Sequence, residues 1–307
     1  MDVGVIGTGI MGRNHVRVYS ELKKVNDLYL YDINSDAATE LAKRNGAKAV
    51  SSLDRMLGQI DAVSICVPTE YHYDVAMSVA EVGVNMLIEK PICLNSKEAE
   101  LLNENIPKDI VVGVGHIERF NPIVKEIQKI IKNPLYIEIK RHNPASGRIS
   151  GSSVVEDLMI HDIDILFNNF KFALPYQLSC SGSNDLCGAL FNFGDLPVYL
   201  STSRKSSKKI RMIYVEEEDF TIEGDFMTQE IFIHRKPEKY SHERSRYVQE
   251  NIIEKVMVNK VEPLKMELCS FIDCVGNNTD FEIPAEQAIL DLKICEEIKS
   301  KCSDTAF

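Results

Sequence analysis

The first apolar run and the turn after it decide the fold. Residues 3–15 read Val-Gly-Val-Ile-Gly-Thr-Gly-Ile-Met-Gly-Arg-Asn-His, a strand-like run followed by a G-x-G-x-x-G pattern. Gly7 permits a tight turn, Gly9 lets the backbone approach a pyrophosphate, and Gly12 lets the next helix pack closely, with its N-terminus facing the anion. The pattern therefore predicts a dinucleotide-binding βα turn. We expect the cofactor to be lined here by Gly7, Thr8, Gly9, Ile10, Met11 and Gly12.

An acidic residue after the second apolar run indicates which dinucleotide is bound. Asp32 follows the run 28–31 and lies twenty positions beyond Gly12. A carboxylate there accepts hydrogen bonds from ribose hydroxyls and repels a 2′-phosphate, so the sequence predicts NAD and not NADP. Two alternatives stay open: a glycine-rich turn without a ligand, and an Asp32 that serves only as a polar end to its strand or as a cap for the helix beginning at Asn34.

Strand-like and helix-like segments alternate through the first third of the chain. Apolar runs cover 3–6, 28–31, 62–67, 86–88 and 110–114, and the segments between them carry helix start and stop signals at 34–46, 69–83 and 96–106. This order predicts an α/β fold, a Rossmann-type doubly wound parallel sheet. We place this NAD-binding domain at residues 1–118.

The pattern changes after about residue 119. Strand candidates now follow one another with alternating inward and outward residues, at 136–140, 198–200, 210–215 and 230–234, with helical segments at 155–167, 263–275 and 284–302. We expect residues 119–307 to form an α+β domain with an open, mainly antiparallel sheet, helices on one face, and a final helix that packs back on the first domain. An exposed alternating sheet face favours a homodimer or homotetramer.

Composition excludes several classes of protein. The 307 residues carry 46 acidic and 35 basic side chains, a net charge of −11. This charge argues against nucleic acid and membrane as general partners. The eight cysteines form no C-x-x-C pair and have no histidine at metal-ligand spacing, so we expect no metal site, and thiols in a reducing, cytoplasmic setting. No apolar run has the length of a membrane span, and the chain opens on a strand-like run where a leader would be charged and then apolar.

Four further motifs complete a pattern that single residues would not identify. They are residues 66–72 (Cys-Val-Pro-Thr-Glu-Tyr-His), 89–91 (Glu-Lys-Pro), 115–122 (Gly-His-Ile-Glu-Arg-Phe-Asn-Pro) and 157–164 (Asp-Leu-Met-Ile-His-Asp-Ile-Asp). With the glycine turn and its following His15, they make the chain resemble the glucose-fructose oxidoreductase/inositol dehydrogenase/MocA (Gfo/Idh/MocA) family over its whole length. The resemblance implies an NAD-dependent dehydrogenase acting on a secondary hydroxyl.

The same resemblance assigns catalytic positions. The lysine of Glu-Lys-Pro and the Asp and His of the D-x-x-x-H motif line the family's substrate pocket, and they fall on Lys90, Asp157 and His161. Alcohol oxidation needs a base for the hydroxyl proton and a cation beside the developing alkoxide, roles that suit His161 and Lys90. Asp157 and Asp164 share a helix face with His161. The alternative is a solvated helix with a core histidine.

Loops at the carboxyl ends of the fourth and fifth strands supply the remaining cofactor candidates. We expect Pro68, Thr69, His72, Glu89 and Lys90 to contact the cofactor, because ligands bind at this edge of a doubly wound sheet. Thr69 also suits a helix cap, Pro68 a loop restraint and His72 a surface position.

Our prediction of the substrate class rests on local positive charge and on the family resemblance. Arg119, Arg141 and Arg148 could hold a diphosphate, as could a basic loop at 201–209, which equally suits solvated residues. With Lys90, Asp157 and His161 these arginines form our set of substrate-binding residues.

Within the family the motifs are most similar to members that oxidise the C3 hydroxyl of UDP-N-acetylglucosamine. A cyclitol or free-sugar dehydrogenase is the alternative, and a dinucleotide-sensing regulator is the alternative of another class. A regulator need not keep Lys90, Asp157 and His161, so their presence favours catalysis.

Overall fold

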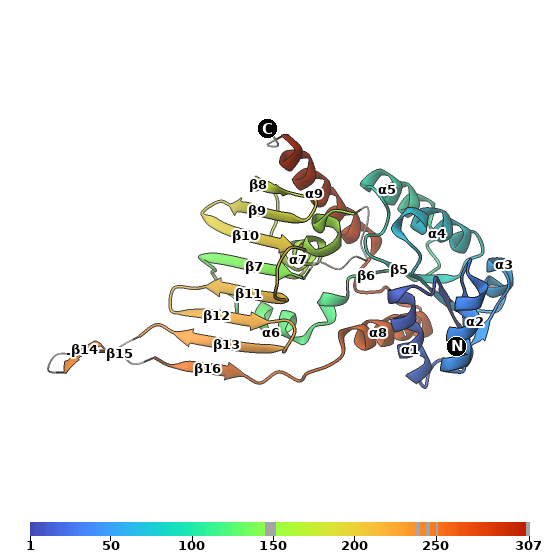
Figure 1. The fold of residues 1–307 in the computed structure, drawn as a ribbon, viewed down its shortest axis with the longest axis horizontal. Helices are drawn as coiled ribbons and strands as arrows, with labels where there is room; N and C mark the ends of the chain where they lie inside the picture. Colours follow the sequence, from blue (N-terminus) through green and yellow to red (C-terminus); the bar gives the residue numbers. More distant parts are fainter. Residues whose placement is uncertain (145–151, 238–239, 244–245, 250, 305–307) are drawn as a thin grey trace. The chain divides into compact units, whose positions relative to one another are not determined.

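The chain forms two compact units. A computed structural model describes residues 1–144, 152–237, 240–243, 246–249 and 251–304 (Figure 1). Unit 1 comprises Met1–Phe120 and Glu262–Lys293, and unit 2 comprises Asn121–Val261 and Ile294–Phe307. The first break lies within two residues of the expected boundary at 118. Residues 262–293, which we expected in the second domain, instead belong to the first unit.

Unit 1 is built on a six-stranded parallel sheet in the order β3-β2-β1-β4-β5-β6. Its strands are β1 Val3–Ile6, β2 Leu28–Tyr31, β3 Lys48–Ala49, β4 Ala62–Ile65, β5 Asn85–Glu89 and β6 Val112–Gly115. Its helices are α1 Ile10–Glu21, α2 Ser35–Asn45, α3 Leu53–Leu57, α4 His72–Glu81, α5 Ser96–Asn105 and α8 Pro263–Asn277, with short 3₁₀ turns at Thr69–Tyr71 (η1) and Ile117–Phe120 (η2). The predicted Rossmann-type sheet is confirmed. The central strands β1 and β4 are buried along their whole length, as expected for a sheet covered on both faces.

Side-chain packing attaches residues 262–293 to unit 1. A Cβ at Gly113 in β6 would lie 2.3 Å from the ring of Phe281, so the glycine lets this ring pack directly on the strand. Phe271 of α8 meets Phe281 edge-on, with ring centroids 5.9 Å apart. Lys24 pairs with Asp273 at the surface. A segment distant in sequence thus completes the core of the first unit.

Unit 2 contains an eight-stranded mixed sheet in the order β16-β13-β12-β11-β7-β10-β9-β8. Its strands are β7 Tyr136–His142, β8 Gln177–Ser183, β9 Leu186–Phe193, β10 Leu196–Ser203, β11 Ile210–Glu216, β12 Phe220–Asp225, β13 Glu230–Arg235 and β16 Ile253–Val256. Neighbouring strands are antiparallel except β7 and β10, which are parallel. A separate hairpin joins β14 Tyr240–Glu243 to β15 Arg246–Gln249. The expectation of a mainly antiparallel sheet is confirmed.

Helices cover one face of this sheet (Figure 1). They are α6 Pro122–Ile130, a continuous helical stretch made of η3 Val155–Met159, α7 Ile160–Asp164 and η4 Ile165–Asn169, and the end of α9 Ala285–Asp304. Along β7 the burial alternates, so Ile137, Ile139 and Arg141 point into the covered side. On the other side, Tyr136, Tyr199 and Tyr214 are half-buried. A subunit contact on this open face stays a prediction.

Within the described residues, every helix is too short or too polar to cross a bilayer. All eight cysteines lie in the described part of the chain, as thiols. The sequence did not predict strands β3, β8, β9, β12 and β16; the run Gln-Leu-Ser-Cys-Ser-Gly-Ser in β8, for example, lacks the apolar alternation that identifies a strand.

Candidate functional site

The glycines of the first turn have the steric roles that the sequence predicts. Gly7 has a φ of +91°, and a Cβ there would lie 2.7 Å from the Cys66 carbonyl oxygen. A Cβ at Gly12 would lie 1.9 Å from the Gly7 carbonyl oxygen, so only glycine lets α1 approach the turn this closely. A Cβ at Gly9 would meet open space, and in the described structure no side chain caps the N-terminus of α1. An exposed backbone beside an uncapped helix start suits a pyrophosphate.

Asp32 is fixed at this turn by protein donors. Its Oδ2 accepts hydrogen bonds from the backbone nitrogen and hydroxyl of Thr8, at 2.6 and 2.8 Å, and its Oδ1 accepts one from the Asn34 nitrogen at 2.8 Å. Burial opposes ionisation, but the hydrogen bonds from Asn34 and Thr8 outweigh it and lower the pKa of Asp32. The carboxylate is therefore charged at neutral pH, and Oδ1 keeps a lone pair for a ribose hydroxyl. Its helix-cap role is not realised, since Asn34 caps α2.

Glu89 turns inward, toward α1. Its Oε1 lies 2.8 Å from the buried His15 Nε2, and its Oε2 accepts a hydrogen bond from the Lys90 nitrogen at 3.3 Å. Burial would raise the pKa of Glu89, but the hydrogen bond and charge of His15 lower it. Glu267 of α8 lies in the same interior, and burial raises its pKa well above the usual range, with the charge of Glu89 adding to the effect. The carboxylate of Glu89 thus fixes the strand end that carries Lys90.

His72 joins two loops of unit 1. The ring is buried, with Nδ1 2.9 Å from the Pro91 carbonyl oxygen and Nε2 2.9 Å from that of Val67. Burial lowers the pKa of His72 although both carbonyls favour the charged ring. The neutral imidazole therefore donates to one of the two carbonyls. With both nitrogens against backbone, the ring lacks a free nitrogen for the cofactor contact that we expected.

The other predicted cofactor residues lie on the same two loops. Pro68 is exposed and precedes η1, Thr69 is half-buried at its first position, and Lys90 is half-buried between Glu89 and Pro91. The loops after β4 and β5 are neighbours because those strands pair in parallel. Cofactor contact by these three residues stays a prediction.

The D-x-x-x-H motif of unit 2 lies on an unusual helix. Residues 155–159 and 165–169 wind as π-helix on either side of the short α7. π-turns are rare and frequent at functional sites. His161 is buried, whereas the Asp157 side chain keeps 20% of its surface exposed. Asp164 is buried and accepts a hydrogen bond from Asn168 at 3.0 Å.

Arg204 contacts Asp157 of the D-x-x-x-H motif, a contact that the sequence did not predict. Its side chain is only 10% exposed, and its Nη2 lies 3.5 Å from Asp157 Oδ2 and donates to the Ser152 carbonyl oxygen at 2.8 Å. We had grouped it with the basic loop at 201–209, whose Lys205 is indeed exposed. The sequence carries no signal that separates the two cations. The structure does, because Arg204 immediately follows β10 and turns inward.

The predicted substrate arginines have different surroundings. Arg141 is 1% exposed, and its Nε and Nη2 both donate to Asp162 Oδ1, at 2.9 and 2.6 Å. Its guanidinium also lies over the Phe226 ring, 5.4 Å from the centroid. A substrate contact would have to break this buried pair. Arg119 is buried in unit 1, where Nη1 donates to the Glu282 carbonyl oxygen at 3.3 Å. Arg148 lies outside the described residues.

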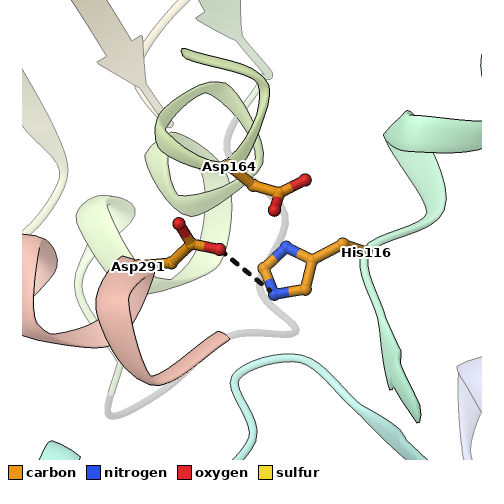
Figure 2. Close-up of side chains that lie close together, drawn as sticks. All are labelled: His116, Asp164 and Asp291. Atoms are coloured by element: carbon orange, nitrogen blue, oxygen red, sulfur yellow. Dashed lines mark ion pairs between the residues drawn. The ribbon is translucent and has the colours of Figure 1, made fainter. Parts of the chain in front are cut away.

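A buried histidine–carboxylate pair follows the last strand of unit 1. His116, directly after β6, places Nε2 3.7 Å from Asp291 Oδ2 on α9, and both side chains are almost completely buried (Figure 2). The pair fixes the start of α9 beside the end of the parallel sheet.

Comparison with known proteins identifies the family. Residues 1–117 match the Gfo/Idh/MocA model, described as an oxidoreductase family with an NAD-binding Rossmann fold. Residues 1–117 therefore form a Rossmann domain of the Gfo/Idh/MocA oxidoreductase type. The predicted resemblance to this family and the NAD(P)-binding Rossmann domain are thereby confirmed.

Individual relatives extend the comparison. It is 36% identical over 167 residues to UDP-N-acetylglucosamine 3-dehydrogenase of Acidithiobacillus ferrooxidans, covering 54% of this chain and 53% of the relative. It is 28% identical over 182 residues to myo-inositol 2-dehydrogenase of Thermotoga maritima, covering 54% and 53%. The chain thus spans about half the length of these curated relatives. The solved structure of UDP-N-acetylglucosamine 3-dehydrogenase GnnA from A. ferrooxidans matches 99% of this chain and 98% of its own, with a TM-score of 0.86 and 26% identity.

We predict that His72 makes the stability of the protein depend on pH. The folded-state pKa of His72 is lowered, so the unfolded chain binds the proton first and stability falls as pH drops below about 6.5, by at most about 1.4 kcal/mol per pH unit. In His72→Gln this contribution disappears. Urea unfolding of both proteins between pH 7.5 and 5 measures the difference. His234→Gln, at a more exposed histidine, should keep the wild-type slope; an unchanged slope in His72→Gln would contradict the assignment.

We predict that Arg141 stabilises the folded protein. Arg141→Met leaves Asp162 buried without its guanidinium and should lower the free energy of unfolding by about 3–5 kcal/mol, and adding Asp162→Leu should recover most of the loss. Urea unfolding measures both effects. Lys140→Met, at the exposed neighbour in β7, should change stability by no more than about 0.5 kcal/mol. A stable Arg141→Met enzyme with a raised KM would instead support the substrate contact.

Proposed function

We propose that this protein is an NAD-dependent dehydrogenase that oxidises a secondary hydroxyl of a sugar nucleotide, with C3 of UDP-N-acetylglucosamine as the first candidate. The observation that carries the proposal is the ionised Asp32 held at the glycine turn by Thr8. A fixed carboxylate at this point selects a ribose with free hydroxyls. Bound NAD supplies the carbon that accepts the hydride.

Each side chain of the proposed active site has a separate role in the oxidation. His161 accepts the hydroxyl proton, because an imidazole titrates near neutrality. Lys90 presents a cation to the oxygen as negative charge develops, and Glu89 fixes the backbone beside it. Asp157 orients a substrate hydroxyl, and Arg204, whose Nη2 lies 3.5 Å from Oδ2, positions its side chain.

The preference for a sugar nucleotide rests on similarity. The relative and solved structure named above act, by their names, on UDP-N-acetylglucosamine, and the structural match covers nearly all of both chains. The 28% identity to an inositol dehydrogenase favours a free polyol as the second candidate. Arg141 is engaged by Asp162, so a diphosphate contact by this arginine would have to compete with that buried pair.

The test is turnover on a panel of substrates. With NAD, the protein should reduce the cofactor on UDP-N-acetylglucosamine and much less on myo-inositol or free N-acetylglucosamine. His161→Asn and Lys90→Met should each lose about 100-fold or more in kcat, while in His161→Asn the Kd for NAD changes by less than about threefold. Absorbance of NADH and a fluorescence titration measure the two quantities.

The matched control is His142→Asn, at a half-buried histidine of unit 2 that hydrogen-bonds Ser201. This variant should keep turnover. Wild-type rates in both catalytic variants would refute the roles of His161 and Lys90. Turnover on no polyol or sugar nucleotide, together with a stoichiometric protein partner, would establish the regulatory alternative.

We predict that Asp32 sets the cofactor preference. Asp32→Ser removes the charge that repels a 2′-phosphate and the acceptor for ribose, so the ratio of NADP to NAD Kd values should fall by at least about tenfold. Titration with both cofactors gives the ratio. Asp36→Ser, at an exposed carboxylate in the first turn of α2, should leave it unchanged. A wild-type protein that binds NADP more tightly would contradict the proposal.

A further inference from the structure

Lys90 lies between two residues that contact buried histidines. Glu89 precedes it, with Oε1 2.8 Å from Nε2 of His15. Pro91 follows it, with its carbonyl oxygen 2.9 Å from Nδ1 of His72. Both imidazoles are almost completely buried, His15 on α1 and His72 at the start of α4. The backbone on each side of Lys90 is therefore tied to a different helix of unit 1.

The carboxylate of Glu89 is enclosed between α1 and the neighbouring strand. Glu89 ends β5 and pairs in register with Gly115 of β6. A Cβ on Gly115 would lie 3.3 Å from Glu89 Oε2, closer than an ordinary contact, so the glycine leaves the space that the carboxylate occupies. Oε1 meets His15, and Oε2 accepts the hydrogen bond from the Lys90 nitrogen at 3.3 Å. In this orientation the carboxylate joins α1 to the backbone of Lys90.

His15 is the partner that keeps Glu89 ionised. Burial disfavours a charged carboxylate, but the hydrogen bond and charge of His15 lower the pKa of Glu89. An ionised carboxylate can only accept, so Nε2 of His15 carries the proton of this hydrogen bond. With an apolar side chain at position 15, the carboxylate would take up a proton or turn away, and its contact with the Lys90 nitrogen would weaken.

The same face of α1 also meets the glycine turn and β4. Gly12, His15 and Tyr19 are at positions i, i+3 and i+7 of α1, and all three are buried. Gly12 packs against the Gly7 carbonyl oxygen. The hydroxyl of Tyr19 lies 2.8 Å from Ser64 Oγ in β4. The helix that begins at the cofactor turn is thus held in register on β4 by Tyr19 and on β5 by His15.

We propose that His15 is a positioning residue for Lys90, acting through Glu89 to fix the lysine relative to the cofactor turn. The proposal rests on the catalytic role of Lys90 in the proposed function. Because His15 is completely buried, its influence reaches Lys90 through the Glu89 carboxylate. A misplacement of about 1 Å can cost about 100-fold in rate, so loss of His15 should affect kcat more than binding.

The test compares the turnover of variants of the full-length protein. His15→Leu should lower kcat at least about tenfold, while KM for the sugar substrate changes by less than about threefold. His15→Gln, whose side-chain amide can donate to Glu89, should recover kcat to within about threefold of the wild type. In a Lys90→Met background, His15→Leu should cost less than about a further threefold, because the group that it positions is gone.

Tyr19→Phe is the matched control. It removes a buried hydrogen bond from the same face of α1, but that bond leads to β4 instead of β5. This variant should keep kcat within about threefold of the wild type. An unchanged kcat in His15→Leu, an equal loss in Tyr19→Phe, or a full further loss in the Lys90→Met background would each overturn the proposal.

A second variant covers the case in which His15→Leu does not fold, as judged by circular dichroism. Glu89→Leu breaks the same contact and leaves no carboxylate in the interior, so it should show the same loss of kcat, at least about tenfold. A wild-type rate in Glu89→Leu would again refute the positioning role.

A further measurement does not depend on turnover. The reactivity of an amine follows its surroundings, so acetylation of Lys90 by acetic anhydride, measured by peptide mass spectrometry, should change in rate at least about threefold in His15→Leu and less in Tyr19→Phe. A wild type that oxidises no sugar or polyol would refute the proposed dehydrogenase. Unchanged acetylation of Lys90 would refute the role of His15, so the two failures are distinct.

Discussion

The contact between Gly12 and the carbonyl of Gly7 is the constraint on which the first unit depends. A single methyl group at Gly12 would lie 1.9 Å from that oxygen, so α1 approaches the turn only because the side chain is absent. This approach leaves the uncapped start of α1 beside an exposed Gly9. It also brings Thr8 within hydrogen-bonding distance of Asp32, which links the turn to the second strand.

Buried polar pairs then fix the loops that carry the chemistry. His15 and Glu89 link α1 to the end of β5, and His72 joins the loops after β4 and β5 through the carbonyls of Val67 and Pro91. In unit 2, Arg141 and Asp162 connect β7 with α7. Such pairs add little net stability relative to apolar packing, but losing one partner is costly, so they hold one arrangement of the backbone.

Prediction from the sequence succeeded where a pattern has a local cause. The strand 3–6, the helix ending at Gly46 and the strand 230–234 follow from periodicity and caps, and the structure has them within one or two residues. It failed where an element depends on residues that lie far away in the sequence. The segment 262–293 joins unit 1 through Phe281 and Gly113, residues 168 positions apart, and β8 forms because β9 pairs with it, not because its own residues favour a strand.

The sequence by itself determined the glycine turn, the acidic end of β2 and the family motifs, because each depends on residues close together in the chain. Only the tertiary structure decided how deeply each polar side chain is buried and which residues it contacts. Arg141 and Arg204 look alike in sequence, yet one is enclosed by Asp162 and Phe226 while the other reaches Asp157. Likewise Cys187 and Cys302 are 115 positions apart and meet only when α9 packs on the sheet. The reason is physical: burial and charge pairing depend on neighbours in space, and for these residues the neighbours come from distant parts of the chain.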